Sequence, residues 1–160
     1  MAFAMDETVQ RSMAKWPGVP DVYGWLSLDR RGNWLINGER IGNAALREFI
    51  ARNYQPDARG CWYFQNGPQR VFVSLAYTPL VLHLERGNAG DALLDHCGRP
   101  FHPEQMFVDG EGSILMHGKP GIGLLDDRDL AGYANRADGL PEIACGAVPA
   151  RFGFVTNPTP

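Results

Sequence analysis

A turn-rich phrase occurs twice in this chain and constrains the fold more than any other feature. SLDRRGNWLINGERIG spans residues 27–42, and FVDGEGSILMHGKPGIG spans residues 107–123. When the phrases are aligned, the identical pairs are Asp29/Asp109, Gly32/Gly112, Leu35/Leu115 and Gly38/Gly118. The second copy has one extra residue near Pro120. With that shift included, Pro68 and Arg70 align with Pro149 and Arg151. We interpret the two phrases as copies of one folding unit.

The residues shared by the two copies are typical of tight turns. An Asp side chain accepts hydrogen bonds from amides two or more residues later, and Gly at the fourth position suits a turn with a bulge. Asn37-Gly38 indicates a second hairpin turn, and His117-Gly118 is its weaker copy. Each copy therefore predicts a three-stranded meander.

A helix is expected after each meander. Asn43 can cap the first helix, and Asp126 or Asp127 can cap the second. The strands expected next are CWYFQN, RVFVSLAY and LVLHLE in the first copy, and PEIACG and RFGFV in the second. The fold class is therefore α+β, with two similar β-meander–helix–β halves forming one compact unit. The expected segments are a helical arm at 1–23, a first repeat at 24–85, a linker at 86–105, a second repeat at 106–156 and a frayed tail at 157–160.

Composition excludes several classes of protein. The 160 residues carry a formal net charge of −3 and no basic cluster, so we expect no nucleic-acid partner. No apolar run approaches the roughly 20 residues that span a bilayer, which predicts no membrane segment. The first residues do not resemble a secretory signal. We expect a cytoplasmic protein with three reduced cysteines.

Several stretches resemble known families. MAKWPGVPDVYGWLSLD, FIARNY, GCWYFQNGPQRVFVSL and TPLVLHL look like a proteobacterial family described as domain of unknown function 2946. The meander–helix–strand order also resembles domain of unknown function family 1285. The resemblance to that family implies an α+β fold with repeated motifs and a signalling or ligand-sensing role. It supplies no catalytic residues.

The stretch DHCGRPFH holds the densest set of reactive side chains. His96, Cys97 and His102 are of the types that bind zinc or iron. Cys97 with His102 and Asp95 can also be arranged as nucleophile, base and orienting acid. The spacing matches no established metal template, so a polar loop is the competing interpretation. Asp29 and Asp109 are expected to be structural turn residues.

Three further residues are candidates for ligand binding. Arg70 and Arg151 each follow a proline at an expected strand start, where a guanidinium can bind a carboxylate or phosphate. Surface ion pairing is the alternative for both. His83 lies opposite the apolar face of its expected strand and is a third candidate, against the alternative of a hydrogen-bonded sheet histidine.

We therefore expect a non-enzymatic ligand-binding or regulatory module, with signalling as its role, no required cofactor and no catalytic residue. Its partner would be a small molecule or a protein. The alternative is a small metal-dependent or thiol enzyme that uses the His96, Cys97 and His102 region. A third possibility is a subunit whose edge strands pair with another chain or with a second copy.

Overall fold

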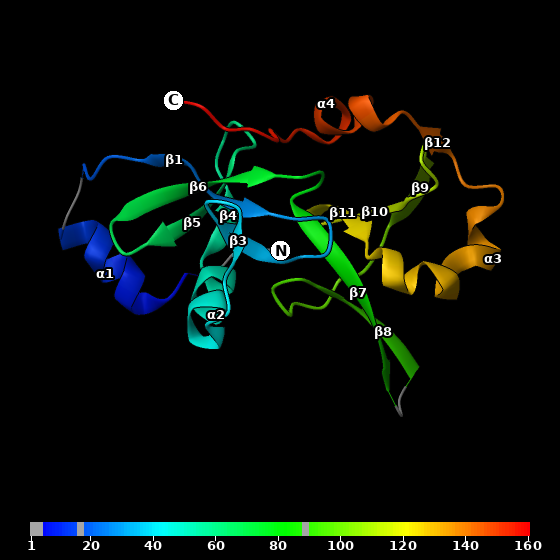
Figure 1. Ribbon diagram of the computed structural model, residues 1–160, viewed down its shortest axis with the longest axis horizontal. Coiled ribbons are helices and arrows are strands. Elements are labelled where there is room, and N and C mark those ends of the chain that lie inside the picture. The colour runs from blue at the N-terminus through cyan, green and yellow to red at the C-terminus, as the bar shows by residue number, and fades with distance from the viewer. Residues whose placement is uncertain (1–4, 16–17, 88–89) are drawn as a thin grey trace. The chain divides into compact units, whose positions relative to one another are not determined.

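The computed structural model describes residues 5–15, 18–87 and 90–160 and contains two six-stranded sheets (Figure 1). The chain divides into two compact units. The first comprises the described parts of Met1–Asp29, Asn33–Ala76 and Phe154–Pro160, and the second comprises Arg30–Gly32 and Tyr77–Gly153. Every helix in the described ranges is too short or too polar to cross a bilayer. The predicted α+β class is confirmed.

The first unit is built on one mixed sheet in the strand order β3-β2-β1-β6-β5-β4. Neighbouring strands are antiparallel except for the parallel pair β1–β6. Its elements are α1 (Glu7–Lys15), β1 (Val22–Leu28), β2 (Trp34–Ile36), β3 (Glu39–Arg40), α2 (Ala44–Arg52), β4 (Tyr54–Pro56), β5 (Trp62–Asn66) and β6 (Gln69–Leu75). Aromatic side chains dominate its core: fully buried Tyr54 contacts Trp34 and Trp62, each at a centroid distance of 4.9 Å.

The second unit holds the sheet β12-β9-β10-β11-β7-β8, in which β11–β7 and β12–β9 are parallel. Its core is mainly aliphatic and includes fully buried Leu80, Leu82, Ile114, Leu115 and Met116. Its elements are β7 (Leu80–Gly87), β8 (Gly90–Asp95), β9 (Gln105–Asp109), β10 (Ile114–Gly118), β11 (Gly121–Leu125), the 3-10 helix η1 (Asp127–Tyr133), α3 (Ala134–Ala137), β12 (Glu142–Ile143), the 3-10 helix η2 (Cys145–Ala147) and α4 (Val148–Phe152).

The duplicated phrases form the same meander in both units. Leu28 on β1 pairs with Trp34 on β2, and Val108 on β9 pairs with Ile114 on β10, in the register that the alignment requires. A helical segment follows each meander, and a strand then returns parallel to the first meander strand: β6 beside β1, and β12 beside β9. The prediction of two similar halves is confirmed.

Two local predictions in the second copy are wrong. The hairpin turn falls at 119–120 instead of His117-Gly118, because β10 continues through Gly118, which pairs with Gly121. His117 remains in the strand and contacts the Phe152 ring at a centroid distance of 5.1 Å. The segment RFGFV begins in α4 instead of forming a strand. Pro149 lies in the first turn of α4, where its missing amide hydrogen costs no bond, and Gly153 ends the helix at a φ of 69°.

Three segments differ from the expected organisation. Strand β7, expected at the end of the first repeat, pairs with β11 in the second sheet, and β8 forms within the expected linker. The C-terminal residues, expected to fray, lie on the first unit. Pro158 is buried, and the Arg59 guanidinium donates to the Thr159 carbonyl at 3.1 Å. Strand pairing holds β7 and β8 in the second sheet, and the Val155 amide donates to the Gly60 carbonyl at 3.0 Å, which holds the C-terminal segment on the first unit.

Candidate functional site

One Asp-x-x-Gly turn is used four times in the structure. In each turn the Asp Oδ1 accepts a hydrogen bond from the amide four residues later, at 2.8–3.0 Å. The Asp amide donates to the carbonyl of that same later residue. The glycine has a φ of 82–84°, which disfavours any side chain. The structural role expected for Asp29 and Asp109 is confirmed. The turns span 29–33, 57–61, 95–99 and 109–113.

The third of these turns lies in the stretch that we singled out for metal or thiol chemistry. Asp95 Oδ1 accepts from the amides of Cys97 and Arg99 at 2.9 and 3.0 Å, so this carboxylate organises the turn. Burial raises the pKa of the Cys97 thiol, and the adjacent Asp95 carboxylate raises it further. A thiol in this environment is a poor nucleophile at neutral pH.

The two histidines of the same stretch have different environments. His96 Nδ1 accepts a hydrogen bond from the Val81 amide at 3.2 Å, so this nitrogen carries no proton. His102 is exposed. Among the residues that the structure describes, His96, Cys97 and His102 do not form a group of three ligand atoms close to one another. Metal binding by these three residues remains a prediction.

The two arginines predicted to bind ligand both lie against aromatic rings. The Arg70 guanidinium contacts both Asp21 carboxylate oxygens at 3.1 and 3.0 Å and lies 5.3 Å from the centroid of Phe72. Exposed Arg151 lies 4.6 Å from the centroid of Phe107. Ion pairing with Asp21 therefore occupies Arg70, while Arg151 is held by cation–π contact. Ligand binding by either residue remains a prediction.

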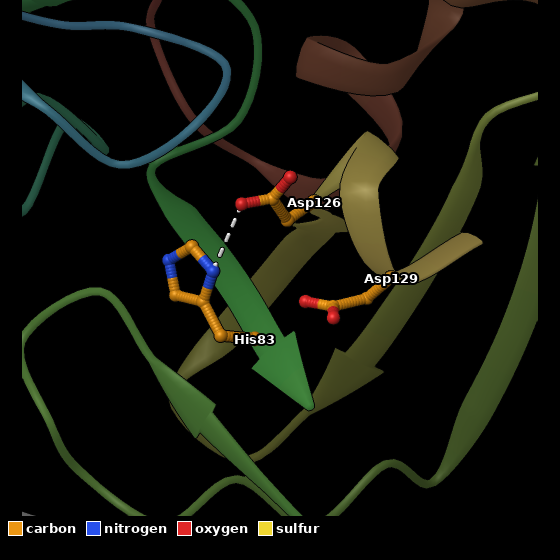
Figure 2. A group of neighbouring side chains, drawn as sticks. All are labelled: His83, Asp126 and Asp129. Carbon is orange, nitrogen blue, oxygen red and sulfur yellow. Dashed lines mark ion pairs between the residues drawn. The ribbon is translucent and has the colours of Figure 1, made fainter. Parts of the chain in front are cut away.

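His83, the third ligand-binding candidate, is brought next to two carboxylates by the parallel pairing of β7 with β11. Leu82 pairs with Leu125, so the next residues along the two strands, His83 and Asp126, lie side by side. The Asp126 amide donates to the Leu82 carbonyl at 2.9 Å and fixes this register. Figure 2 shows the resulting ion pair, in which His83 Nδ1 lies 3.0 Å from Asp126 Oδ2.

Asp129 joins the pair from the first turn of η1. Asp126 caps η1 by accepting from the Arg128 amide at 2.9 Å, and Asp129 Oδ2 accepts from the Leu84 amide of β7 at 3.2 Å. One ligand atom from each of His83, Asp126 and Asp129 lies within 4.8 Å of the others (Figure 2). We name these three residues the His-Asp-Asp cluster. It is the group of potential metal ligands found within the described ranges.

The electrostatics of the cluster centre on Asp126, whose side chain is only 1% exposed. Burial disfavours its charge, but hydrogen bonds from the Arg128 guanidinium and amide outweigh burial and lower the pKa of Asp126 to about 2. Asp126 is therefore an anion at neutral pH. Arg31 makes the equivalent pair with the next acid, Asp127, at 2.9 and 3.0 Å.

The turn that contains Gly32 closes one side of the cluster. A Cβ atom at Gly32 would lie 3.2 Å from His83 Nε2 and 2.7 Å from His96 Cβ. The space beside Nε2 is therefore filled by the turn, and Nδ1 is the ring nitrogen that faces Asp126. Only glycine fits this position without displacing a neighbour.

The sequence analysis named His83 as a candidate ligand-binding residue but did not place Asp126 and Asp129 beside it. Asp126 was expected only as a helix cap, and Asp129 was not singled out. The available signal was a group of three acids, at positions 126, 127 and 129, directly after the apolar stretch GIGLL. The sequence did not show that these acids lie beside His83, because that contact depends on the pairing of β7 with β11, which are about forty residues apart in the chain.

Comparisons with known proteins give a family and a fold. The family model described as "Protein of unknown function (DUF2946)" matches residues 5–142. No curated protein is significantly similar to the chain. A DUF1285 family protein from Silicibacter pomeroyi DSS-3 is similar at a TM-score of 0.53 and 16% identity, over 77% of this chain and 74% of that chain.

A DUF1285 family protein from Shewanella baltica OS155 is similar at a TM-score of 0.51 and 17% identity, over 71% of this chain and 92% of that chain. At these identities the likeness concerns the fold alone. The family match spans most of the sequence and confirms the resemblance inferred from its motifs. This chain belongs to the DUF2946 family of proteins of unknown function.

Proposed function

We propose that this protein is a non-enzymatic binding module whose second unit holds one divalent metal ion at the His-Asp-Asp cluster. The observation that carries the proposal is the convergence of His83, Asp126 and Asp129 from two elements, with their ligand atoms within 4.8 Å of one another. The Asp126 amide donates to the Leu82 carbonyl, and the Leu84 amide donates to the Asp129 carboxylate; these two bonds hold that arrangement.

The donor set selects the class of metal. One imidazole nitrogen and two carboxylate oxygens suit zinc and similar transition metals, whereas magnesium and calcium prefer oxygen ligands alone. Tetrahedral zinc places its donor atoms about 3.4 Å apart. The widest separation in the cluster therefore has to close by at most about 1.4 Å on binding. Three protein ligands leave a fourth position for water or a second ligand.

Two observations favour this module over the thiol-enzyme alternative. Burial of Cys97 raises the pKa of its thiol and disfavours the nucleophilic thiolate. Asp95, which would orient the base in such an enzyme, already accepts two backbone amides. A regulatory or signalling role and a cytoplasmic location are parts of the same proposal. Three free cysteines support a reducing compartment.

Zinc titration by isothermal calorimetry tests the proposal. The unmodified protein should bind one equivalent, and His83→Ala or Asp129→Asn should weaken binding by at least about tenfold, because each removes a ligand. His102→Ala is the matched control, since His102 is exposed and outside the cluster. This control should bind as the unmodified protein does.

Two results would overturn the proposal. One is the absence of zinc binding by folded, unmodified protein. The other is zinc binding that His102→Ala abolishes and His83→Ala leaves intact, which would move the site to the His96, Cys97 and His102 region. Circular dichroism spectra of each variant establish that the fold is retained.

A further inference from the structure

The Arg128 guanidinium is hydrogen-bonded to the Asp126 carboxylate, which is a ligand of the proposed metal site. Its Nε lies 3.0 and 3.1 Å from the two oxygens of Asp126, and its Nη2 lies 2.5 Å from Oδ2. The same Oδ2 is the atom paired with His83. A metal ion bound by Asp126 and His83 therefore competes with the guanidinium for the same oxygen.

The two partners differ in their freedom to move. The Asp126 side chain is 1% exposed, whereas the Arg128 side chain is 59% exposed and can rotate into water. The Arg128 amide separately donates to Asp126 Oδ1 at 2.9 Å. The carboxylate therefore stays fixed by the backbone when the guanidinium leaves.

The neighbouring arginines distinguish the two acids of the cluster from each other and from the adjacent Asp127. Arg128 pairs with Asp126 and Arg31 pairs with Asp127, each with both carboxylate oxygens. Across the described part of the chain, Asp129 has no cationic side chain within ion-pairing distance, and its hydrogen bond comes from the Leu84 amide. Asp129 is thus available to a cation at once, whereas Asp126 becomes available only after Arg128 departs.

We infer that Arg128 is a built-in counter-ion that the metal displaces from Asp126, so that metal affinity is set by competition with this guanidinium. The inference rests on the proposed function. Competition requires that removing the guanidinium strengthens metal binding. It also requires that the loaded protein presents a released Arg128 side chain to solvent, which is a change of surface charge distribution that a regulatory partner can recognise.

The test compares zinc affinity in Arg128→Gln and Arg31→Gln. Both variants remove one arginine charge beside the same 3-10 helix, but only Arg128 contacts a proposed ligand. Loss of a charge-assisted hydrogen bond is expected to raise zinc affinity by about tenfold or more in Arg128→Gln. Arg31→Gln should raise it by about twofold, through the weaker action of a screened surface charge.

A measurement on the unmodified protein makes the test independent of variant folding. In a nitrogen-15 NMR titration with zinc, the Arg128 Nε signal should shift and broaden, because its hydrogen bonds to Asp126 break. The Arg31 Nε signal should stay at its position.

The possible outcomes separate the two claims. Equal affinity gains in Arg128→Gln and Arg31→Gln, or a static Arg128 Nε signal during zinc binding, would overturn the displacement while leaving the metal site intact. A lower affinity in Arg128→Gln would also overturn it. If neither the unmodified protein nor Arg128→Gln binds zinc, both the proposed metal site and the proposed displacement are wrong.

Discussion

Replacement of Gly32 by alanine is expected to destabilise the protein by about 2–4 kcal/mol. A φ of 84° at Gly32 costs an alanine about 1–2 kcal/mol, partly offset by reduced freedom of the unfolded chain. The new Cβ would also lie 2.7 Å from His96 Cβ and 3.2 Å from His83 Nε2. Since His96 Cβ is attached directly to the backbone, relieving this overlap requires a shift of main chain, at about 1–3 kcal/mol.

Gly112→Ala is the matched control for this substitution. Gly112 has the same position in its Asp-x-x-Gly turn and a φ of 83°, but a Cβ there meets nothing within 4 Å. Its cost should be the conformational part alone, about 1 kcal/mol. Urea denaturation of both variants, followed by fluorescence and circular dichroism, measures the difference. Equal losses of unfolding free energy in the two variants would refute the close packing of Gly32 against the histidines.

Three other substitutions or reactions test separate parts of the structure. Tyr77→Phe removes a 2.8 Å hydrogen bond to buried Asp109, whose pKa is lowered because this bond and backbone amides outweigh burial. Tyr77→Phe should lower the unfolding free energy by about 1.5–3 kcal/mol near neutral pH. Measured by urea denaturation, this loss should become smaller as the pH falls below 3.8, the ordinary carboxyl pKa, because Asp109 is then protonated in the unfolded chain. A loss that stays constant with pH would contradict this linkage. Asn43→Ala removes the side-chain cap on the Leu46 amide and should cost about 1 kcal/mol in a thermal melt, whereas no loss would mean that the cap is dispensable. Half-buried Cys97 should react with a disulfide reagent much more slowly at pH 7 than free cysteine, and equal rates would contradict the raised pKa of its thiol.

The features that could be predicted from the sequence depend on residues close together in the chain. Asp29 and Gly32 specify their turn within five residues, and Asn43 specifies the start of α2 through its bond to the Leu46 amide. Asp95 and Gly98 specify a turn in the same way, but we interpreted Asp95 as part of a reactive group with Cys97. The fourfold use of the turn became clear only from the hydrogen bonds.

The features that could not be predicted depend on pairing between distant segments. His83 and Asp126 meet because β7 runs parallel to β11, and the buried apolar residues 80–82 at the start of β7 do not reveal which strand lies beside them. The prediction of a strand at RFGFV, at the end of the second copy, was wrong for a different reason. Pro149 and Gly153 provide helix-start and helix-end signals there, and these outweighed the aromatic residues that suggested a strand.

Anomalous X-ray scattering at the zinc edge, from crystals of the zinc-loaded protein, tests the proposed metal site most directly. The account predicts one strong peak bonded to His83 Nδ1, Asp126 and Asp129, with the Arg128 guanidinium turned away from Asp126. A zinc peak at His102 or Cys97, or an empty His-Asp-Asp cluster with Arg128 still paired to Asp126, would contradict it.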